Sequence, residues 1–172
     1  VEIIDQTKLP FTFEISRLED CAMAATAIRD MWVRGAPLIG ATAAYGMALA
    51  MRGDPSDANV LAAAQALMAT RPTAVNLRWA VDAMQTLLLP LAPNAREKAA
   101  YNRAAEICDE DVAICSSIGD HGLSLIHNIW EMRGKPDRIN LLTHCNAGWL
   151  ATVDWGTALA PIYKAHDSIN KL

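Results

Sequence analysis

The sequence predicts a protein of the α+β class: a mainly helical N-terminal domain with a small antiparallel β-hairpin, followed by the first β-α unit of a second, incomplete domain. Hydrophobic residues make up 52% of the 172 residues, while aromatics are only 6% and alanine is abundant. That balance favours close-packed helices over a sheet sandwich. The apolar residues have helical spacing over most of the chain, and a strand-like pattern appears late, so we place the domains at residues 1–136 and 137–172.

The first element is a predicted β-hairpin, because residues 1–4 and 11–15 have the composition of short strands and are joined by a turn at Pro10. From Leu18 onward the apolar residues follow helical spacing and predict a helix over residues 18–31. The two patterns together predict that a small antiparallel sheet precedes the helical part of the domain.

Four further helices are predicted before residue 136. One covers residues 37–51, where Pro37 suits the first turn because its missing N–H is not needed there. Its many Gly and Ala residues let neighbouring backbones approach closely, so we place this helix centrally. A second helix is expected at residues 56–70, capped by Ser56 or Asp57, and a third at residues 76–88. The apolar face of the third helix consists of Leu77, Val81, Met84, Leu87 and Leu88. The fourth helix is expected at residues 95–133, capped by Asn94, and a break in it would fall at Gly119 to Gly122.

The pattern changes after Pro136. Residues 137–143 are typical of a short strand with an apolar centre, and a turn precedes a helix that we expect over residues 149–165. A strand, a turn and a helix in that order are how a doubly wound domain begins. Because a parallel strand needs partners on its edges, we expect this second domain to be incomplete in the chain.

Composition and charge argue against several classes of function. The formal net charge is −4, and the 15 Lys and Arg residues are scattered, which does not suit a nucleic-acid surface. The longest apolar stretch, residues 36–51, is too short to cross a bilayer, and no signal peptide is visible. The four cysteines show neither disulfide nor metal spacing and are most simply buried thiols. We therefore expect a cytoplasmic protein that binds neither nucleic acid nor membrane.

Cys145 is the first candidate for chemistry. It follows the predicted strand and precedes the predicted helix, which is where α/β domains place their ligands. A thiol at a helix N-terminus is favoured as thiolate by the helix dipole. Asn146 and Gly148 would allow a tight turn with free backbone amides. A packed cysteine at a strand-to-helix corner is the alternative interpretation.

Two further candidates are anion sites. Gly35 and Ala36 form a turn at a helix start, with Arg34 beside their backbone amides. Arg78 lies in the first turn of another helix, where a cation opposes the dipole and often serves a ligand. The alternatives are a simple helix connector and a solvated helix start.

Other polar residues suggest less. The four histidines lack the HxxxH or HExxH spacing that puts two imidazoles on one helix face, so no metal site is predicted. The acidic triplet of residues 109–111 is most simply a solvated helix face. No GxGxxG, Walker A or GxSxG element is present, so nucleotide binding and serine hydrolysis have no support.

Three motifs, in order along the chain, closely resemble the methylthioribose-1-phosphate isomerase family. They are VRGAPLIGA at residues 33–41, PTAVNLRWA at 72–80, and LTHCNAG at 142–148 with GTAL at 156–159. The resemblance implies a small sheet and helical domain followed by a Rossmann-like domain, usually in a homodimer. It also implies conversion of an aldose 1-phosphate to a ketose 1-phosphate, in methionine salvage or the related 5-deoxyribose pathway, without metal or cofactor.

Carried over by motif, Arg34, Gly35 and Ala36 would bind the sugar-phosphate substrate, Arg78 would hold its phosphate, and Cys145 would be the catalytic cysteine. A phosphate on the anomeric carbon hinders ring opening, so an acid must protonate the ring oxygen and a base must manage the proton between C1 and C2. The family's catalytic aspartate lies in a part of the Rossmann-like domain that this chain does not contain, so we expect the chain alone to be inactive. Proton transfer and hydride shift stay open as mechanisms.

Two alternatives accompany this resemblance. The same fold family includes regulatory subunits of the guanine-nucleotide exchange factor for eukaryotic translation initiation, which typically lack the Cys145 motif. A ribose-1,5-bisphosphate isomerase would share the cysteine. Trp149 and the pair Asp154-Trp155 depart from many members of the isomerase family and leave the choice of substrate open.

Overall fold

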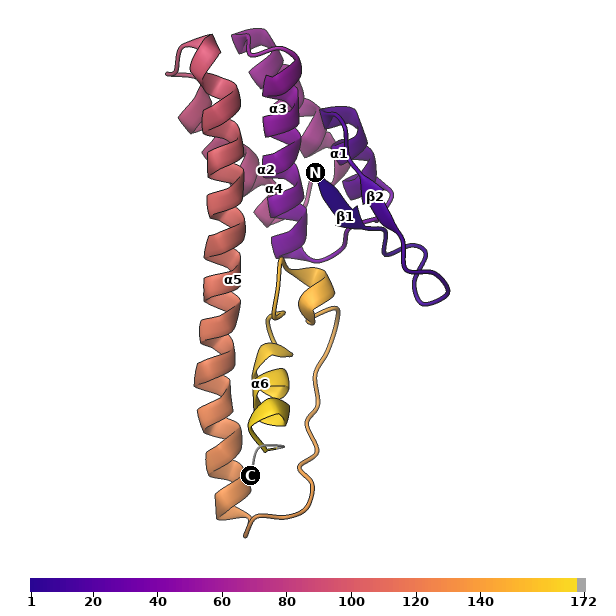
Figure 1. The fold of residues 1–172 in the computed structure, drawn as a ribbon, viewed down its shortest axis with the longest axis vertical. Coiled ribbons are helices and arrows are strands. Elements are labelled where there is room, and N and C mark those ends of the chain that lie inside the picture. Colours follow the sequence, from indigo (N-terminus) through magenta and orange to yellow (C-terminus); the bar gives the residue numbers. More distant parts are fainter. Residues whose placement is uncertain (170–172) are drawn as a thin grey trace. The chain divides into compact units, whose positions relative to one another are not determined.

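The computed structural model describes residues 1–169 and consists of two compact units, Val1–Cys108 and Asp109–Leu172 (Figure 1). The first unit contains a two-stranded sheet and four helices, together with the start of the long helix α5 (Pro93–Met132). The second unit contains the remainder of α5, a short 3-10 helix and α6 (Ala160–Ile169). No helix among residues 1–169 combines the length and apolar composition that a membrane span requires.

The predicted antiparallel hairpin is confirmed, but the second strand was misplaced. Strand β1 (Glu2–Ile4) pairs with β2 (Ile15–Arg17), and Ile4 lies opposite Ile15. Of the residues expected to form this strand, only Ile15 belongs to β2, and residues 11–14 are part of the connection. A turn at Asp5 begins this connection. The Asp5 carboxylate accepts hydrogen bonds from the amide (2.9 Å) and the hydroxyl (2.6 Å) of Thr7.

The helices of the first unit lie close to where the sequence placed them. They are α1 (Cys21–Arg29), α2 (Ala36–Gly53), α3 (Asp57–Thr70) and α4 (Val75–Leu88). The predicted Ser56 cap is confirmed, since its hydroxyl accepts a hydrogen bond from the Asn59 amide at 3.2 Å. Helix α5 begins at Pro93, so Asn94 lies inside the helix rather than capping it.

Helix α2 is the centre of the first unit, as its small residues predicted. It packs against α1, α3 and α4. A Cβ on Gly46 would lie 3.0 Å from the Leu67 side chain and 3.1 Å from that of Ala24, so the lack of a side chain permits this close approach. The largest fully buried side chains around it contribute about 1.5–3 kcal/mol each. They are Leu18, Ile28, Met47, Met51, Leu67, Leu77, Met84 and Leu88.

A buried arginine joins the connections between these helices. Arg96 is 2% exposed, and its guanidinium donates to the carbonyl oxygens of Pro55 (2.8 Å), Leu91 (3.0 Å) and Leu89 (3.2 Å). It also forms an ion pair with Asp57. This cation therefore holds the loop before α3 against the loop before α5.

In the second unit, α5 continues without the break that Gly119 and Gly122 would allow. Both glycines face α6 instead. A Cβ on Gly122 would clash with the ring of Pro161, and one on Gly119 would lie 2.9 Å from the Lys164 side chain. The glycines thus permit close helix packing rather than a helix end.

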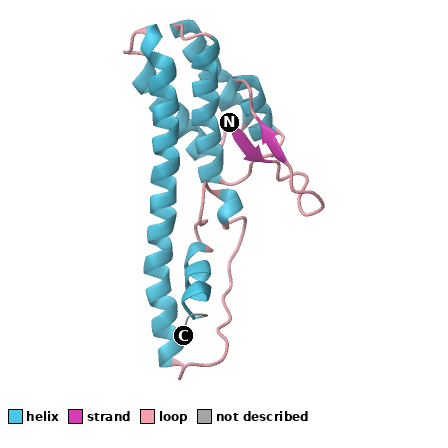
Figure 2. Ribbon diagram, in the orientation of Figure 1, coloured by secondary structure: helices cyan, strands magenta, loops and turns pink. Residues whose placement is uncertain are grey.

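The strand predicted at residues 137–143 does not form, and the predicted helix over residues 149–165 is wrong in extent. The segment is irregular chain (Figure 2), and Leu142 is fully exposed. It leads to the 3-10 helix η1 (Trp149–Ala151), a loop and then α6. The physical reason is that a strand needs a neighbour for its N–H and C=O groups, and residues 109–169 contain none. The predicted β-α unit is therefore not built within the described residues.

Candidate functional site

Helix α2 begins with an uncapped turn. Gly35 is its N-cap residue, with a φ of 110°, a backbone conformation that favours glycine. No side chain caps the helix start, and Pro37 occupies the first turn. The first-turn amides of Ala36 and Leu38 are therefore available to an acceptor that is not part of this helix. Arg34 precedes them and is exposed.

Helix α4 begins in the same way. Its N-cap is Ala74, which offers no side-chain acceptor, and its first turn holds no acidic residue. Arg78 is exposed in that turn. By contrast, the starts of α1 and α3 are capped by the side chains of Asp20 and Ser56.

The starts of α2 and α4 lie next to each other. A Cβ on Gly40 would lie 3.1 Å from the backbone oxygen of Asn76, so the second turn of α2 touches the first turn of α4. Two positive helix ends side by side, each with an arginine, create a potential that suits a phosphate or another anion. The structure thus brings together the two helix starts that carry four of the five predicted site residues: Arg34, Gly35, Ala36 and Arg78.

Cys145 lies in the second unit, in a turn before η1. It is exposed and has a φ of 69°, which is uncommon for a residue with a side chain. The helix that was expected directly after it is only the three-residue η1, so a helix dipole does not act on this thiol. The predicted stabilisation of the Cys145 thiolate by a helix N-terminus is therefore wrong for the described residues.

The other cysteines are less accessible. Cys115 is buried, while Cys21 and Cys108 are half-buried. Burial, together with the neighbouring Asp111, raises the pKa of the Cys115 thiol to about 11. Burial and the neighbouring Asp20 raise the pKa of the Cys21 thiol to about 11 as well. Of the four thiols, only Cys145 is both exposed and placed in a motif.

The loop after Cys145 closes on itself. The carbonyl oxygen of Ala147 accepts hydrogen bonds from the amides of Thr157 (3.0 Å) and Leu159 (3.3 Å). Gly156 has a φ of 78°, and a Cβ there would lie 2.5 Å from the backbone of Gly148. The two parts of the third motif, LTHCNAG and GTAL, are therefore in contact.

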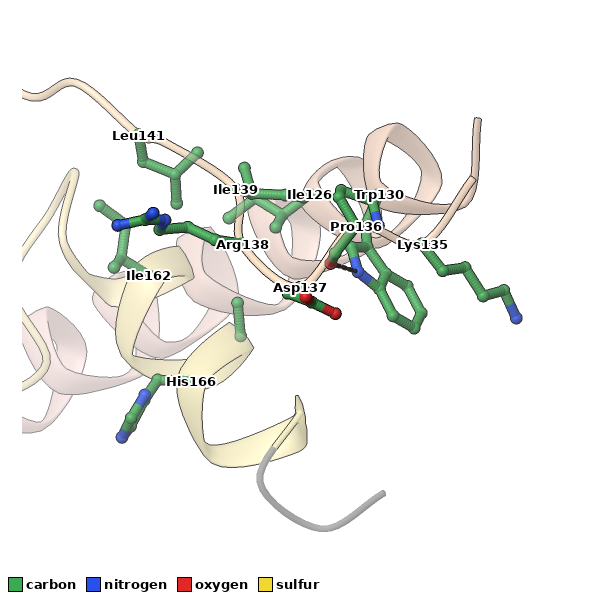
Figure 3. Close-up of a pocket in the computed structure, with 11 residues that line it drawn as sticks. Ile126, Trp130, Lys135, Pro136, Asp137, Arg138, Ile139, Leu141, Ile162 and His166 are labelled. Carbon is green, nitrogen blue, oxygen red and sulfur yellow. Dashed lines mark hydrogen bonds between the residues drawn. The ribbon is translucent and has the colours of Figure 1, made fainter. Parts of the chain in front are cut away.

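A cavity of about 340 Å³ lies between α5, α6 and the irregular segment of the second unit (Figure 3). Trp130 forms part of its wall and donates a hydrogen bond from Nε1 to the Pro136 carbonyl at 2.9 Å. The side chain of Lys135 extends away from the other lining residues in Figure 3. None of the five predicted site residues lines this cavity.

A second cavity, of about 290 Å³, belongs to the loop after Cys145. Its lining residues are Trp149, Asp154, Trp155 and Tyr163. They include the residues that depart from the isomerase pattern. Within residues 1–169, no group of three or more His, Cys, Asp or Glu side chains is placed to hold a metal ion.

Comparison of the sequence with known families gives the class of protein: the chain belongs to the Initiation factor 2 subunit family, which it matches over residues 32–172. It is 60% identical over 172 residues to a methylthioribose-1-phosphate isomerase of Rhodospirillum rubrum, an alignment that covers 98% of this chain and 44% of that protein. It is 58% identical over 168 residues to the enzyme of that name from Escherichia coli, with 98% and 45% covered. The resemblance predicted from the three motifs is confirmed, and the chain spans less than half the length of these relatives.

Two solved structures share the fold. One is the translation initiation factor eIF-2B, subunit delta, from A. fulgidus, with a TM-score of 0.83 and 36% identity over 97% of this chain and 48% of that one. The other is 5-methylthioribose 1-phosphate isomerase from Pyrococcus horikoshii, with a TM-score of 0.83 and 32% identity over 99% and 48%. Because the two TM-scores are equal, the fold alone does not choose between an enzyme and a translation factor.

Proposed function

We propose that the full-length protein is an aldose–ketose isomerase. It converts S-methyl-5-thioribose 1-phosphate, or 5-deoxyribose 1-phosphate, to the corresponding ribulose 1-phosphate in methionine salvage, as a metal-free cytoplasmic homodimer. The observation that carries the proposal is the pair of adjoining, uncapped helix starts with Arg34 and Arg78, since positive helix ends beside arginines favour an anion such as phosphate. Curated relatives about 60% identical to the chain carry the isomerase name, which supports the same assignment.

In this proposal, Gly35 and Ala36 bind the substrate through backbone amides, and Arg34 adds a charge-assisted contact. Arg78 holds the phosphate, because a guanidinium can donate two parallel hydrogen bonds to phosphate oxygens. Glycine is needed at position 35 because its φ of 110° and the close approach of a ligand both disfavour a side chain.

Cys145 is proposed as the catalytic cysteine. Its thiolate would act as the base that moves the proton between C1 and C2, while an acid supplied by the rest of the protein protonates the ring oxygen. Its exposure in a left-handed turn supports this role, because strained backbone of this kind gathers at active sites. We further propose that residues 137–172 open a Rossmann-like domain, in which residues 137–143 pair with neighbouring strands once these are present.

The test is the isomerase activity of the full-length protein and of its Cys145→Ala variant. The variant is expected to lose activity by more than about 10³-fold, because the base that takes up the proton is removed. Cys108→Ala, at a half-buried thiol outside the motif, is the matched control and should keep its rate. An undiminished rate for Cys145→Ala would contradict the proposal.

Arg78→Ala tests the phosphate site separately. It should raise KM more than it lowers kcat, and Arg78→Lys should recover part of the affinity because it keeps the charge but not the paired donors. Assays with methylthioribose 1-phosphate, 5-deoxyribose 1-phosphate and ribose 1,5-bisphosphate side by side identify the substrate.

The second candidate is a non-catalytic regulatory subunit related to the translation factor, favoured by the 36% identity to the eIF-2B delta structure. Such a protein would bind a sugar phosphate or a nucleotide-linked ligand at the same helix starts without turning it over. Binding of the sugar phosphate, measured by calorimetry, with no product formed would support this alternative over the enzyme.

A further inference from the structure

We propose that Asp111 is a positioning residue for Cys145: its carboxylate holds the loop after Cys145 against helix α5 and thereby sets where the thiol lies. This inference rests on the proposed function, because positioning matters only if the thiol acts on a substrate. The acidic triplet of residues 109–111 was expected to be a solvated helix face, and Asp109 and Glu110 are indeed exposed. Asp111 is half-buried and bonded instead.

Both oxygens of the Asp111 carboxylate have a partner. One accepts a hydrogen bond from the backbone amide of Val153 at 2.8 Å, and the other accepts from the Cys115 thiol, with Sγ at 3.7 Å. Cys115 is buried, and its raised pKa keeps it protonated and able to donate at neutral pH. The bond to Val153 is charge-assisted and joins residues 42 positions apart in the sequence, so it fixes the loop to the helix.

Hydrogen bonds within the loop connect Val153 to the turn that contains Cys145. Next to Val153, the buried Thr152 hydroxyl accepts from the Gly156 amide (3.0 Å) and donates to the Asp154 carbonyl (2.8 Å). The following residue, Thr157, donates to Ala147, only two positions after Cys145. A loop closed by such bonds moves as one piece, so fixing it at Val153 fixes the turn of the thiol.

Two substitutions at Asp111 distinguish the effect of its hydrogen bond from the effect of its charge. Asp111→Asn keeps a side-chain oxygen that can accept from Val153, and it turns an amide toward Cys115, whose sulfur is a weak acceptor. Asp111→Ala leaves the Val153 amide without its partner and frees the loop. Asp109→Ala removes an exposed carboxylate from the same helix and is the matched control.

The experiment measures kcat, KM and the rate of Cys145 alkylation by iodoacetamide in the full-length protein and these three variants. Asp111→Ala should lower kcat by on the order of 10- to 100-fold with little change in KM, since a small misplacement of a reacting group has that effect. Its Cys145 alkylation rate should shift at least about fivefold with the thiol's altered surroundings. Asp111→Asn should recover most of kcat, and Asp109→Ala should match the wild type.

Thermal unfolding of each variant gives the folded fraction, to which the rates are normalised. The proposal is overturned if Asp111→Ala keeps kcat and the alkylation rate after this correction, or if Asp111→Asn is as poor as Asp111→Ala. If the wild-type protein turns over none of the sugar phosphates, the proposed function fails. The alkylation rates then still test whether Asp111 controls the surroundings of the thiol.

Discussion

Three residues of the motifs have backbone angles in the left-handed region: Gly35, Cys145 and Gly156. At Gly35 and Gly156 glycine adopts the conformation without steric cost. Cys145 has a Cβ, so its conformation costs on the order of 1–2 kcal/mol and persists only because the surrounding turn holds it. The family motif therefore encodes backbone shape as well as chemistry.

Gly156→Ala should destabilise the protein more than Gly134→Ala, although the two glycines have nearly the same φ, 78° and 77°. A Cβ at position 134 meets nothing within 4 Å, so only the left-handed conformation costs free energy, about 1–2 kcal/mol. At position 156 a Cβ would lie 2.5 Å from the Gly148 backbone, which adds about 1–3 kcal/mol. Urea unfolding of both variants measures the difference, and equal losses would argue against the close contact between the two halves of the third motif.

At the scale of elements, Lys164 of α6 bonds to α5, and two glycines of α5 let the two helices pack closely. Lys164 Nζ donates to the carbonyl and hydroxyl oxygens of Ser116, both at 2.8 Å, and to the Asp120 carboxylate at 2.7 Å. The same amine lies 4.7 Å from the centre of the Trp155 ring. This ammonium group is largely buried and fully engaged, so it ties α5, α6 and the Cys145 loop into one unit.

Gly122→Ala is expected to loosen this packing and Gly119→Ala to do so less. Alanine raises helix propensity at both positions by about 1 kcal/mol. At position 122 the new methyl group meets the rigid Pro161 ring, which costs more than that gain. At position 119 it would lie 2.9 Å from methylene carbons of Lys164, so the neighbouring side chain must shift less than Pro161 must at position 122, where the approach is closer. Protection of α6 amides from hydrogen exchange should fall in Gly122→Ala, and unchanged protection there would show that α6 does not depend on this contact.

At the scale of the whole molecule, each compact unit contains a thiol that must stay protonated when the protein folds. Cys21 belongs to the first unit and Cys115 to the second, and in both cases burial is the main reason that the pKa rises from 9.0 to about 11. Below pH 9 both thiols are protonated in the folded and the unfolded state. As the pH rises from 9 toward 11, the unfolded chain loses these protons before the folded protein does, so folding becomes less favourable.

The free energy of unfolding should therefore fall as the pH rises from 9 to 11. Urea unfolding at a series of pH values measures it. The double variant Cys21→Ala/Cys115→Ala retains the lysines and tyrosines that also titrate in this range, so it isolates the contribution of the thiols. Its stability should depend less steeply on pH, and an identical slope would be inconsistent with thiols that stay protonated in the folded state.

Local sequence was sufficient to predict features that depend on one helix turn or on one helix face. Ser56 caps α3 as predicted, and the small residues of α2 placed that helix at the centre of the first unit. The strand at residues 137–143 was predicted from the same kind of pattern and does not form, because a strand also needs partners that the pattern cannot supply. Nothing in the sequence indicated that Arg96 is buried and joins two loops, since its partners are backbone carbonyl groups that any residue provides.

The sequence by itself determined the helices of the first unit, the family and the five motif residues proposed as the site, because these depend on local spacing and on residue identity. Only the tertiary structure decided that the starts of α2 and α4 adjoin, that GTAL packs against the turn after Cys145, and that Asp111 bonds to Val153 rather than to water. These contacts join segments far apart in the chain. Their free energy depends on distance and on exclusion of water, neither of which a single stretch of sequence specifies.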